Sequence, residues 1–184
     1  MQRELVNFTI EEGKIEEVKR IIKLDNRLLN YKNEKGRSLV FIAAMEGHKD
    51  ILSYLISEGS NIHTSNKAGN TPLVAAVVKN HPDCVRLLVE EGANPNSIYK
   101  HRRATMPIYN YAVFHNLTEC SEILRRTSGI NLEFKDSVGI SGYEINLFAK
   151  DKGSPYVKDI QKRLTIRFRK RNRGRSKLFN KIIK

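Results

Sequence analysis

Apolar residues recur at helical spacing in short segments that are separated by glycine and asparagine. One apolar stripe lies between residues 51 and 56, and a stripe of the same spacing lies 33 residues further along the chain. The stripes consist of Ile51, Leu52, Leu55 and Ile56 in the first segment, and of Cys84, Val85, Leu88 and Val89 in the second. Each stripe is followed by a glycine, Gly59 or Gly92, a residue that often ends helices. The pattern predicts two equivalent helices, each with one buried face.

The agreement between the two copies extends over a whole unit of 33 residues. Aligned pairs are Gly36 with Gly69, Ser38 with Thr71, Ala43 with Ala76, His48 with His81, Gly59 with Gly92, and Asn61 with Asn94. Ser38 and Thr71 carry the side-chain oxygen that caps a helix, and Pro72 suits a first helical turn. Gly47 and Asn80 tolerate the left-handed conformation at which we expect these first helices to end. A second helix then carries each apolar stripe, so the unit is a helix, a turn and a helix.

The second copy closely follows a known repeat pattern. It reads Gly69-Asn70-Thr71-Pro72-Leu73, then Ala75-Ala76, Asn80-His81, Leu87-Leu88 and Gly92-Ala93-Asn94. This resembles the ankyrin repeat, which has the same period. The resemblance implies an all-α ankyrin-repeat solenoid of helix-turn-helix units with β-turn loops, with about four repeats plus capping units. It also implies a non-enzymatic protein-protein interaction module that binds another protein through its concave face and loop tips.

We expect the repeat domain to cover residues 1–166 and a basic tail to cover residues 167–184. The expected units are 1–32 as an amino-terminal cap, 33–65, 66–98, 99–135, and 136–166 as a degenerate carboxyl-terminal unit. The unit 99–135 carries about four extra residues, because Gly92 and Gly129 are 37 positions apart. In this unit Met106-Pro107-Ile108 stands in place of Thr-Pro-Leu. Terminal units of a solenoid depart from the pattern because one of their faces meets water.

The histidine content both follows and departs from the family pattern. His48 and His81 fall at the turn between the two helices, where the family uses histidine structurally. The family also has a histidine after Thr-Pro-Leu that ties neighbouring loops by hydrogen bonds. We assign Phe41, Val74 and Tyr109 to that position. We therefore expect the inter-loop bonds to be missing or replaced by apolar packing.

The family's variable contact positions, carried over to this sequence, predict a partner-binding surface. Its residues in the units 33–65 and 66–98 are Glu34, Lys35, Arg37, Met45, Glu46, Lys67, Ala68, Asn70, Val78 and Lys79. The next loop, Tyr99-Lys100-His101-Arg102-Arg103, is extended, basic and aromatic, and Tyr and Arg are frequent anchors at protein interfaces. Two interpretations of this loop stay open: it contacts the partner, or it only accommodates the inserted residues.

The net charge of +13 is concentrated at one end of the chain. Of the 33 basic residues, eleven lie between Lys162 and Lys184 without an acidic residue, which leaves 22 basic against 20 acidic residues elsewhere. The densest run contains Arg167, Arg169, Lys170, Arg171, Arg173 and Arg175. An amphipathic stretch from Leu178 to Ile183 follows. Such a tail suits electrostatic binding to nucleic acid or an anionic membrane, or nuclear import in a eukaryotic cell. A solvated tail, or one packed on the last repeat, is the simpler alternative.

The remaining residues suggest no catalytic, metal or cofactor site, and we expect none. His63, His101 and the two cysteines, Cys84 and Cys120, lack metal-ligand spacing. Two widely spaced cysteines favour a reducing compartment, and we expect a cytoplasmic monomer without a signal peptide. The richness in Ile, Lys and Asn is typical of AT-rich genomes, including intracellular bacteria and viruses whose ankyrin proteins act on host proteins. Delivery into a host cell or its nucleus is therefore a further alternative.

Overall fold

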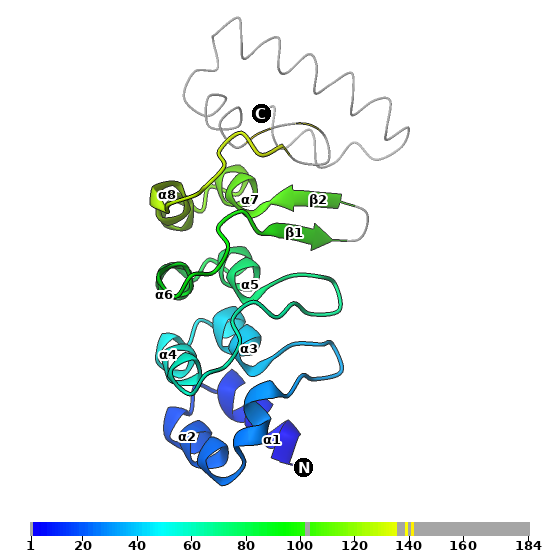
Figure 1. The fold of residues 1–184 in the computed structure, drawn as a ribbon, viewed down its shortest axis with the longest axis vertical. Coiled ribbons are helices and arrows are strands. Elements are labelled where there is room, and N and C mark those ends of the chain that lie inside the picture. Colours follow the sequence, from blue (N-terminus) through cyan, green and yellow to red (C-terminus); the bar gives the residue numbers. More distant parts are fainter. Residues whose placement is uncertain (1, 102–103, 136–138, 140, 142–184) are drawn as a thin grey trace, which may run out of the picture.

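Short helices alternate between two layers along the chain. The computed structural model describes residues 2–101, 104–135, 139 and 141. Its elements are α1 (Gln2–Glu11), α2 (Ile15–Leu24), the 3-10 helix η1 (Asn26–Asn30), α3 (Leu39–Glu46), α4 (Lys49–Ser57), α5 (Pro72–Val78), α6 (Pro82–Glu90), β1 (Ile98–His101), β2 (Ala104–Pro107), α7 (Ile108–Phe114) and α8 (Thr118–Arg126). Figure 1 shows α1, α3, α5 and α7 stacked as an inner layer and α2, α4, α6 and α8 as an outer layer. The helices form the all-α solenoid that the sequence predicts, and the expected unit 136–166 lies outside the described residues except for 139 and 141.

The ends of the inner helices follow from single residues. The Ser38 hydroxyl accepts a hydrogen bond from the Phe41 N–H at 3.2 Å, which caps α3, and Thr71 caps α5 through the Val74 N–H at 3.4 Å. Gly47 ends α3 with φ 84°, and Asn80 follows α5 with φ 60°. Both are left-handed conformations, which only glycine and a few short polar residues adopt at low cost. The predicted caps and turns are therefore confirmed.

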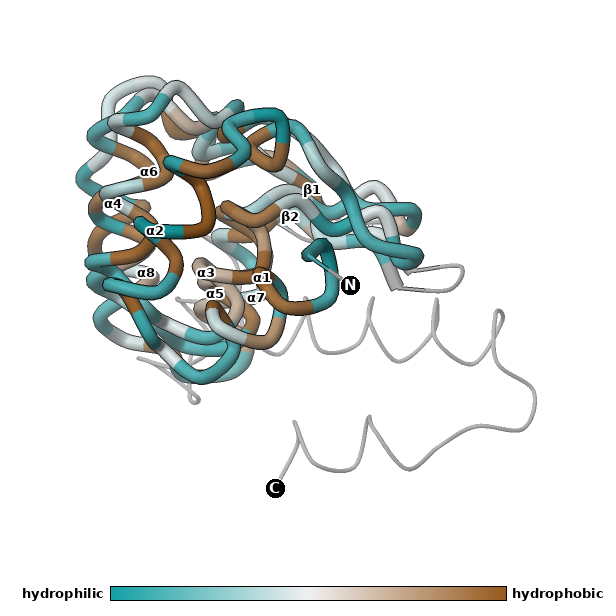
Figure 2. The backbone as a smooth tube through the Cα atoms, turned by 90° about the horizontal axis from the view of Figure 1, so that it is seen from below, coloured by the Kyte–Doolittle hydropathy of each residue, from teal (hydrophilic) through white to brown (hydrophobic). Residues whose placement is uncertain are grey.

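The core lies between the two layers. The inner helices contribute small residues, with Ala43, Ala76 and Ala112 fully buried at equivalent positions. Because these side chains are small, neighbouring inner helices can approach closely. The outer helices contribute larger residues, with Leu55, Leu88 and Leu124 fully buried. In Figure 2, which looks along the stack, hydrophobic residues line the helices and hydrophilic residues dominate the loops that project to one side.

The histidines at the turns connect successive repeats. The Nε2 atom of His48 lies 3.2 Å from the Glu11 carbonyl oxygen, and Nε2 of His81 lies 3.0 Å from the Met45 carbonyl oxygen. In each pair the ring nitrogen donates, because a carbonyl oxygen only accepts. Each histidine therefore satisfies a carbonyl at the end of the preceding inner helix, which would otherwise lack a partner within that helix. The structural role predicted for both residues is confirmed.

The third repeat departs from a simple β-turn loop. Strands β1 and β2 form an antiparallel hairpin in which Tyr99 pairs with Met106 and Lys100 pairs with Thr105. Asn116 has φ 56° and ends α7 as Asn80 ends α5, and the two residues are 36 positions apart. Because the period elsewhere is 33, three inserted residues precede α7 and lengthen the loop into two strands.

The hairpin corrects one assignment made from the sequence. Phe41 and Val74 each precede the left-handed turn residue by six positions, and in the third repeat Asn110 holds that place, not Tyr109. Asn110 is fully buried, and its amide donates a hydrogen bond to the Phe134 carbonyl at 3.1 Å. The Asn110 side chain therefore hydrogen bonds to the segment that follows α8. In the family, a histidine at this position makes such a bond.

Phe41 and Val74 are buried, which agrees with the apolar packing expected at their positions. The expectation that ties between loops are missing is nevertheless wrong, because backbone groups and asparagine side chains form them instead. None of the helices in the described part of the chain combines the length and apolar content needed to cross a bilayer.

Candidate functional site

The loops between repeats have a defined shape because asparagine side chains close them. The Asn33 carbonyl oxygen Oδ1 accepts hydrogen bonds from the N–H groups of Lys35 and Arg37, both at 3.0 Å. Asn66 does the same for Ala68 at 2.9 Å and for Asn70 at 3.0 Å. Asparagine favours such turns because its short amide reaches the backbone two residues on. These bonds give the loops a fixed shape, and the loops project to one side of the inner helices, on the right in Figure 1.

Neighbouring loops are also bonded to one another. The Lys67 N–H donates to the Lys35 carbonyl at 3.1 Å. The amide of Asn70 donates to the Lys100 carbonyl at 3.0 Å, and its Oδ1 accepts from the Lys100 N–H at 2.7 Å. We call the surface formed by residues 33–37, 66–70 and 98–101 the loop edge. These bonds join the loop edge into one continuous surface that runs along the stack.

The predicted partner-binding residues that the structure describes lie in two places: on the loop edge, and at the ends of α3 and α5, where Met45, Glu46, Val78 and Lys79 are found. Exposed positions among them are Glu34, Lys35, Glu46, Lys67, Ala68, Lys79 and Lys100, and half-buried ones are Arg37, Met45, Val78 and Tyr99. Arg102 and Arg103 lie outside the described residues, and His101 ends β1. Asn70 is a correction: it is 8% exposed and its amide is engaged by Lys100, so it positions the loop edge and is not a contact residue.

An aromatic cluster adjoins the loop edge, and sequence reasoning found only one of its members. The ring of Tyr99 packs against Tyr111 at 4.8 Å between centroids, in an edge-to-face arrangement. His115 stacks on Tyr111 at 4.2 Å and also contacts Phe114 at 5.1 Å. Burial, followed by the neighbouring Tyr99, raises the pKa of Tyr111 above its ordinary value. In the sequence, only the aromatic enrichment of residues 109–115 indicates this cluster, and such enrichment is equally typical of a buried core.

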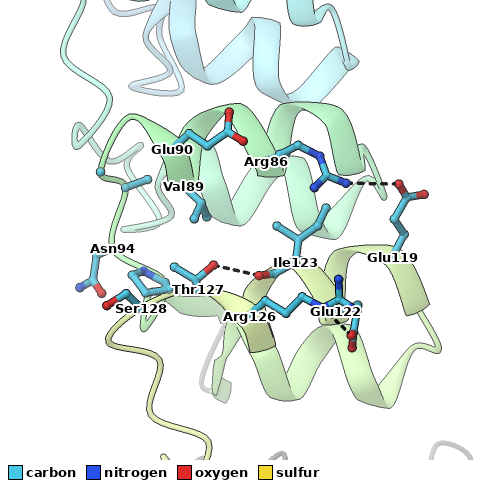
Figure 3. A pocket seen from close by; sticks show the side chains of 13 residues that line it. Arg86, Val89, Glu90, Asn94, Glu119, Glu122, Ile123, Arg126, Thr127 and Ser128 are labelled. Carbon is cyan, nitrogen blue, oxygen red and sulfur yellow. Dashed lines mark hydrogen bonds and ion pairs between the residues drawn. The ribbon is translucent and has the colours of Figure 1, made fainter.

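A groove lies between helices of the outer layer, away from the loop edge. It has a volume of about 550 Å³ between α6 and α8 (Figure 3). Four of its five charged side chains form ion pairs: Arg86 lies 3.9 Å from Glu119, and Arg126 lies 2.8 Å from Glu122. Glu122 also accepts from Arg125, the largest of several causes that lower its pKa to about 2. Because these charges satisfy each other, we place the candidate site on the loop edge and not in the groove.

The two cysteines are structural residues of the outer helices. Cys84 and Cys120 are both free and fully buried at equivalent positions of α6 and α8. Burial raises the pKa of each thiol to about 11, so the reactive thiolate is scarce near neutral pH. Among the described residues, no three His, Cys, Asp or Glu side chains lie close enough together to hold a metal ion. The compartment in which the chain works stays a prediction.

Comparison with known proteins agrees with this geometry. A family model for ankyrin repeats, in three copies, matches residues 6–99. The chain therefore belongs to the ankyrin-repeat family. No curated protein sequence matches it. Ankyrin repeats are generally protein-interaction modules and are typically non-enzymatic.

Proposed function

We propose that this chain is a non-enzymatic interaction module that binds one protein partner across the loop edge and the exposed ends of the inner helices. The observation that carries the proposal is the hydrogen bonding between successive loops, from Lys35 to Lys67 and from Asn70 to Lys100. A surface that is already rigid loses little conformational entropy when a partner binds, which favours affinity.

The exposure of the side chains supports the same surface. Lys35, Lys67 and Lys100 are exposed in successive loops, and Glu46 and Lys79 are exposed at equivalent ends of inner helices. Extended surfaces of this kind are the ones that solenoid repeats use for recognition. A partner would therefore contact several repeats at once, and single substitutions would each weaken binding only partly.

Site-directed photocrosslinking tests this proposal and does not require the partner to be identified beforehand. A photoreactive amino acid is placed at Lys35, Lys67 or Lys79 in separate full-length chains, and at the outer-layer positions Arg20 and Lys49 as matched controls. We expect Lys35, Lys67 and Lys79 to crosslink to one shared protein in cells and the outer positions not to do so. Crosslinking of that protein from the outer positions alone would contradict the proposal.

The basic tail carries a second candidate function from a different class. Eleven basic residues between Lys162 and Lys184 without an acidic residue suit electrostatic binding to nucleic acid or an anionic membrane. These residues lie outside the described part of the chain, so the argument rests on the charge pattern alone. Binding by the tail and binding by the repeats are compatible, and the salt dependence of DNA binding in a tail variant separates them.

A further inference from the structure

We propose that the loop edge recognises an acidic protein segment that also carries apolar side chains, by means of a row of lysines and, at the ends of the inner helices, a row of apolar residues. This inference rests on the proposed function, and it adds the chemistry of the partner. Its starting point is that each of the three loop-edge segments contributes one exposed lysine, namely Lys35, Lys67 and Lys100.

The lysines are aligned by the backbone and by two glycines. A Cβ atom on Gly36 would lie 2.9 Å from the Lys67 backbone nitrogen and 3.1 Å from Lys67 Cγ. A Cβ on Gly69 would lie 3.0 Å from the Lys100 ammonium nitrogen. Lys67 and Lys100 therefore lie over the glycine of the preceding loop, where any larger residue would displace them. Lys35 is next to this pair because its carbonyl accepts the hydrogen bond from the Lys67 N–H.

The charges in this row are not balanced within the fold. None of the ion pairs among the described residues involves Lys35, Lys67 or Lys100. Glu34 is the only acidic residue in residues 33–37, 66–70 and 98–101. Like charges held side by side repel each other and lower stability. The charges of this row therefore form no ion pair among the described residues that would stabilise the fold, and they are complementary to a negatively charged partner.

A second row, of apolar residues, lies at the ends of the inner helices opposite the lysines. Met45, Val78 and Phe114 each precede the left-handed turn residue of their repeat by two positions, and each is half-buried. They lie near the far ends of the inner helices, roughly 10 Å from the loop edge for helices of this length. Phe114 also contacts His115 and so joins the aromatic cluster.

The two rows together distinguish between polyanions. A nucleic acid strand would use the lysines for its phosphates and could stack a base on Phe114, but the aliphatic Met45 and Val78 offer its bases no such stacking. An acidic protein segment with interspersed apolar side chains can satisfy both rows, since apolar anchors at the centre of an interface with charges at its rim are the usual arrangement. The observations therefore favour a protein segment.

The test uses two labelled probes and, as the reference chain, the full-length chain with Arg167, Arg169, Lys170, Arg171, Arg173 and Arg175 replaced by glutamine, because the basic tail would otherwise bind both probes. One probe is a fluorescein-labelled synthetic peptide with the repeating sequence Glu-Leu-Glu, and the other is fluorescein-labelled single-stranded DNA. Built on this reference chain, the loop variant carries Lys35→Gln, Lys67→Gln and Lys100→Gln. The control variant removes the same charge from the outer layer through Arg20→Gln, Lys23→Gln and Lys49→Gln. Circular dichroism confirms that both variants are folded.

We expect the loop variant to bind the peptide about tenfold more weakly, because it loses three exposed charge pairs with the peptide. The control variant should stay within about twofold of the reference chain. No binding of the peptide by the reference chain, or an equal loss in both variants, would overturn the inference. Neither result would affect the proposed function if the photoreactive positions Lys35, Lys67 and Lys79 still crosslink to a shared protein.

The apolar row is tested by a separate pair of variants. Met45→Gln with Val78→Thr should weaken peptide binding and leave DNA binding unchanged. Val78→Thr alone, which keeps the side-chain shape, provides the same test if the double variant does not fold. If peptide binding is unaffected by these changes, or if DNA binding falls by as much, the surface binds polyanions in general and the inference is wrong.

Discussion

The amide of Asn70 hydrogen bonds to both the N–H and the carbonyl of Lys100, at 2.7 and 3.0 Å. The Asn70 side chain thus hydrogen bonds to a backbone N–H and a backbone carbonyl of β1, groups to which a neighbouring strand would otherwise bond. Asn96 makes a second bridge between the same two units, 66–98 and 99–135: its amide donates to the Gly129 carbonyl at 2.8 Å, and its Oδ1 accepts from the Asn131 N–H at 2.7 Å. Two connections between these units therefore depend on single asparagines.

Replacing Asn70 by alanine should destabilise the chain. The change removes both bonds to Lys100, and the loss of such paired bonds costs about 1–3 kcal/mol in free energy of unfolding. Urea denaturation followed by circular dichroism measures the difference. Asn30→Ala is the matched control, because Asn30 is exposed and has no side-chain hydrogen bond among the described residues. A similar loss in both variants would show that the bridge does not stabilise the fold.

The turn after α7 should tolerate glycine but not a β-branched residue. Asn116 has φ 56°, a conformation that costs other L-residues roughly 1–2 kcal/mol. We expect Asn116→Gly to leave the melting temperature nearly unchanged and Asn116→Val to lower it by several degrees. Differential scanning calorimetry of the two variants checks this. Equal melting temperatures for Gly and Val would show that the backbone relaxes at this position.

The layered architecture could be predicted from the sequence because its signals are local and repeated. The caps at Ser38 and Thr71, the turns at Gly47 and Asn80, and the outer-helix stripes all recur at a fixed offset. Repetition confirms each signal independently. The same reasoning located the solvent-facing loops, although the solenoid does not by itself indicate what they bind.

The third repeat is the part of the fold that local patterns do not predict. The sequence aligns Pro107 with Pro72, but Pro72 begins α5 whereas Pro107 ends β2. The alignment therefore places Tyr109 where the structure has Asn110. The hairpin results from pairing between residues whose partners depend on backbone register, which no local pattern reveals. The role of Asn70 was missed for the same reason, since its partner lies 30 residues away.

Alkaline pH should destabilise the chain through its cysteines. Burial raises the thiol pKa of Cys84 and Cys120 from 9.0 to about 11 in the folded state. Folding therefore favours the neutral thiol, so the stabilisation is complete below about pH 9 and is lost as the pH rises toward 11. The size is about 2 kcal/mol for each thiol.

Urea denaturation at intervals from pH 8 to pH 11 measures this loss. The double variant Cys84→Ala with Cys120→Ala is the comparison: its lower overall stability reflects lost packing, but its stability should fall less steeply with pH. In the unmodified chain, thiol-specific reagents should react slowly until urea unfolds it. Parallel pH profiles for the two proteins would show that other groups control alkaline unfolding.

The basic tail should bind nucleic acid through simple charge neutralisation. Replacing Arg167, Arg169, Lys170, Arg171, Arg173 and Arg175 by glutamine removes six positive charges. For single-stranded DNA, each phosphate contact contributes about 0.7 to the slope of log affinity against log salt, so the slope should fall by about 4. Fluorescence anisotropy over a salt series measures the slope. The control variant with Arg20→Gln, Lys23→Gln and Lys49→Gln should keep most of the slope, because the charges that it lacks lie on the outer helices and not in the tail. If the tail variant retains full affinity and slope, nucleic acid binding does not use the tail, and the repeat domain is its remaining source.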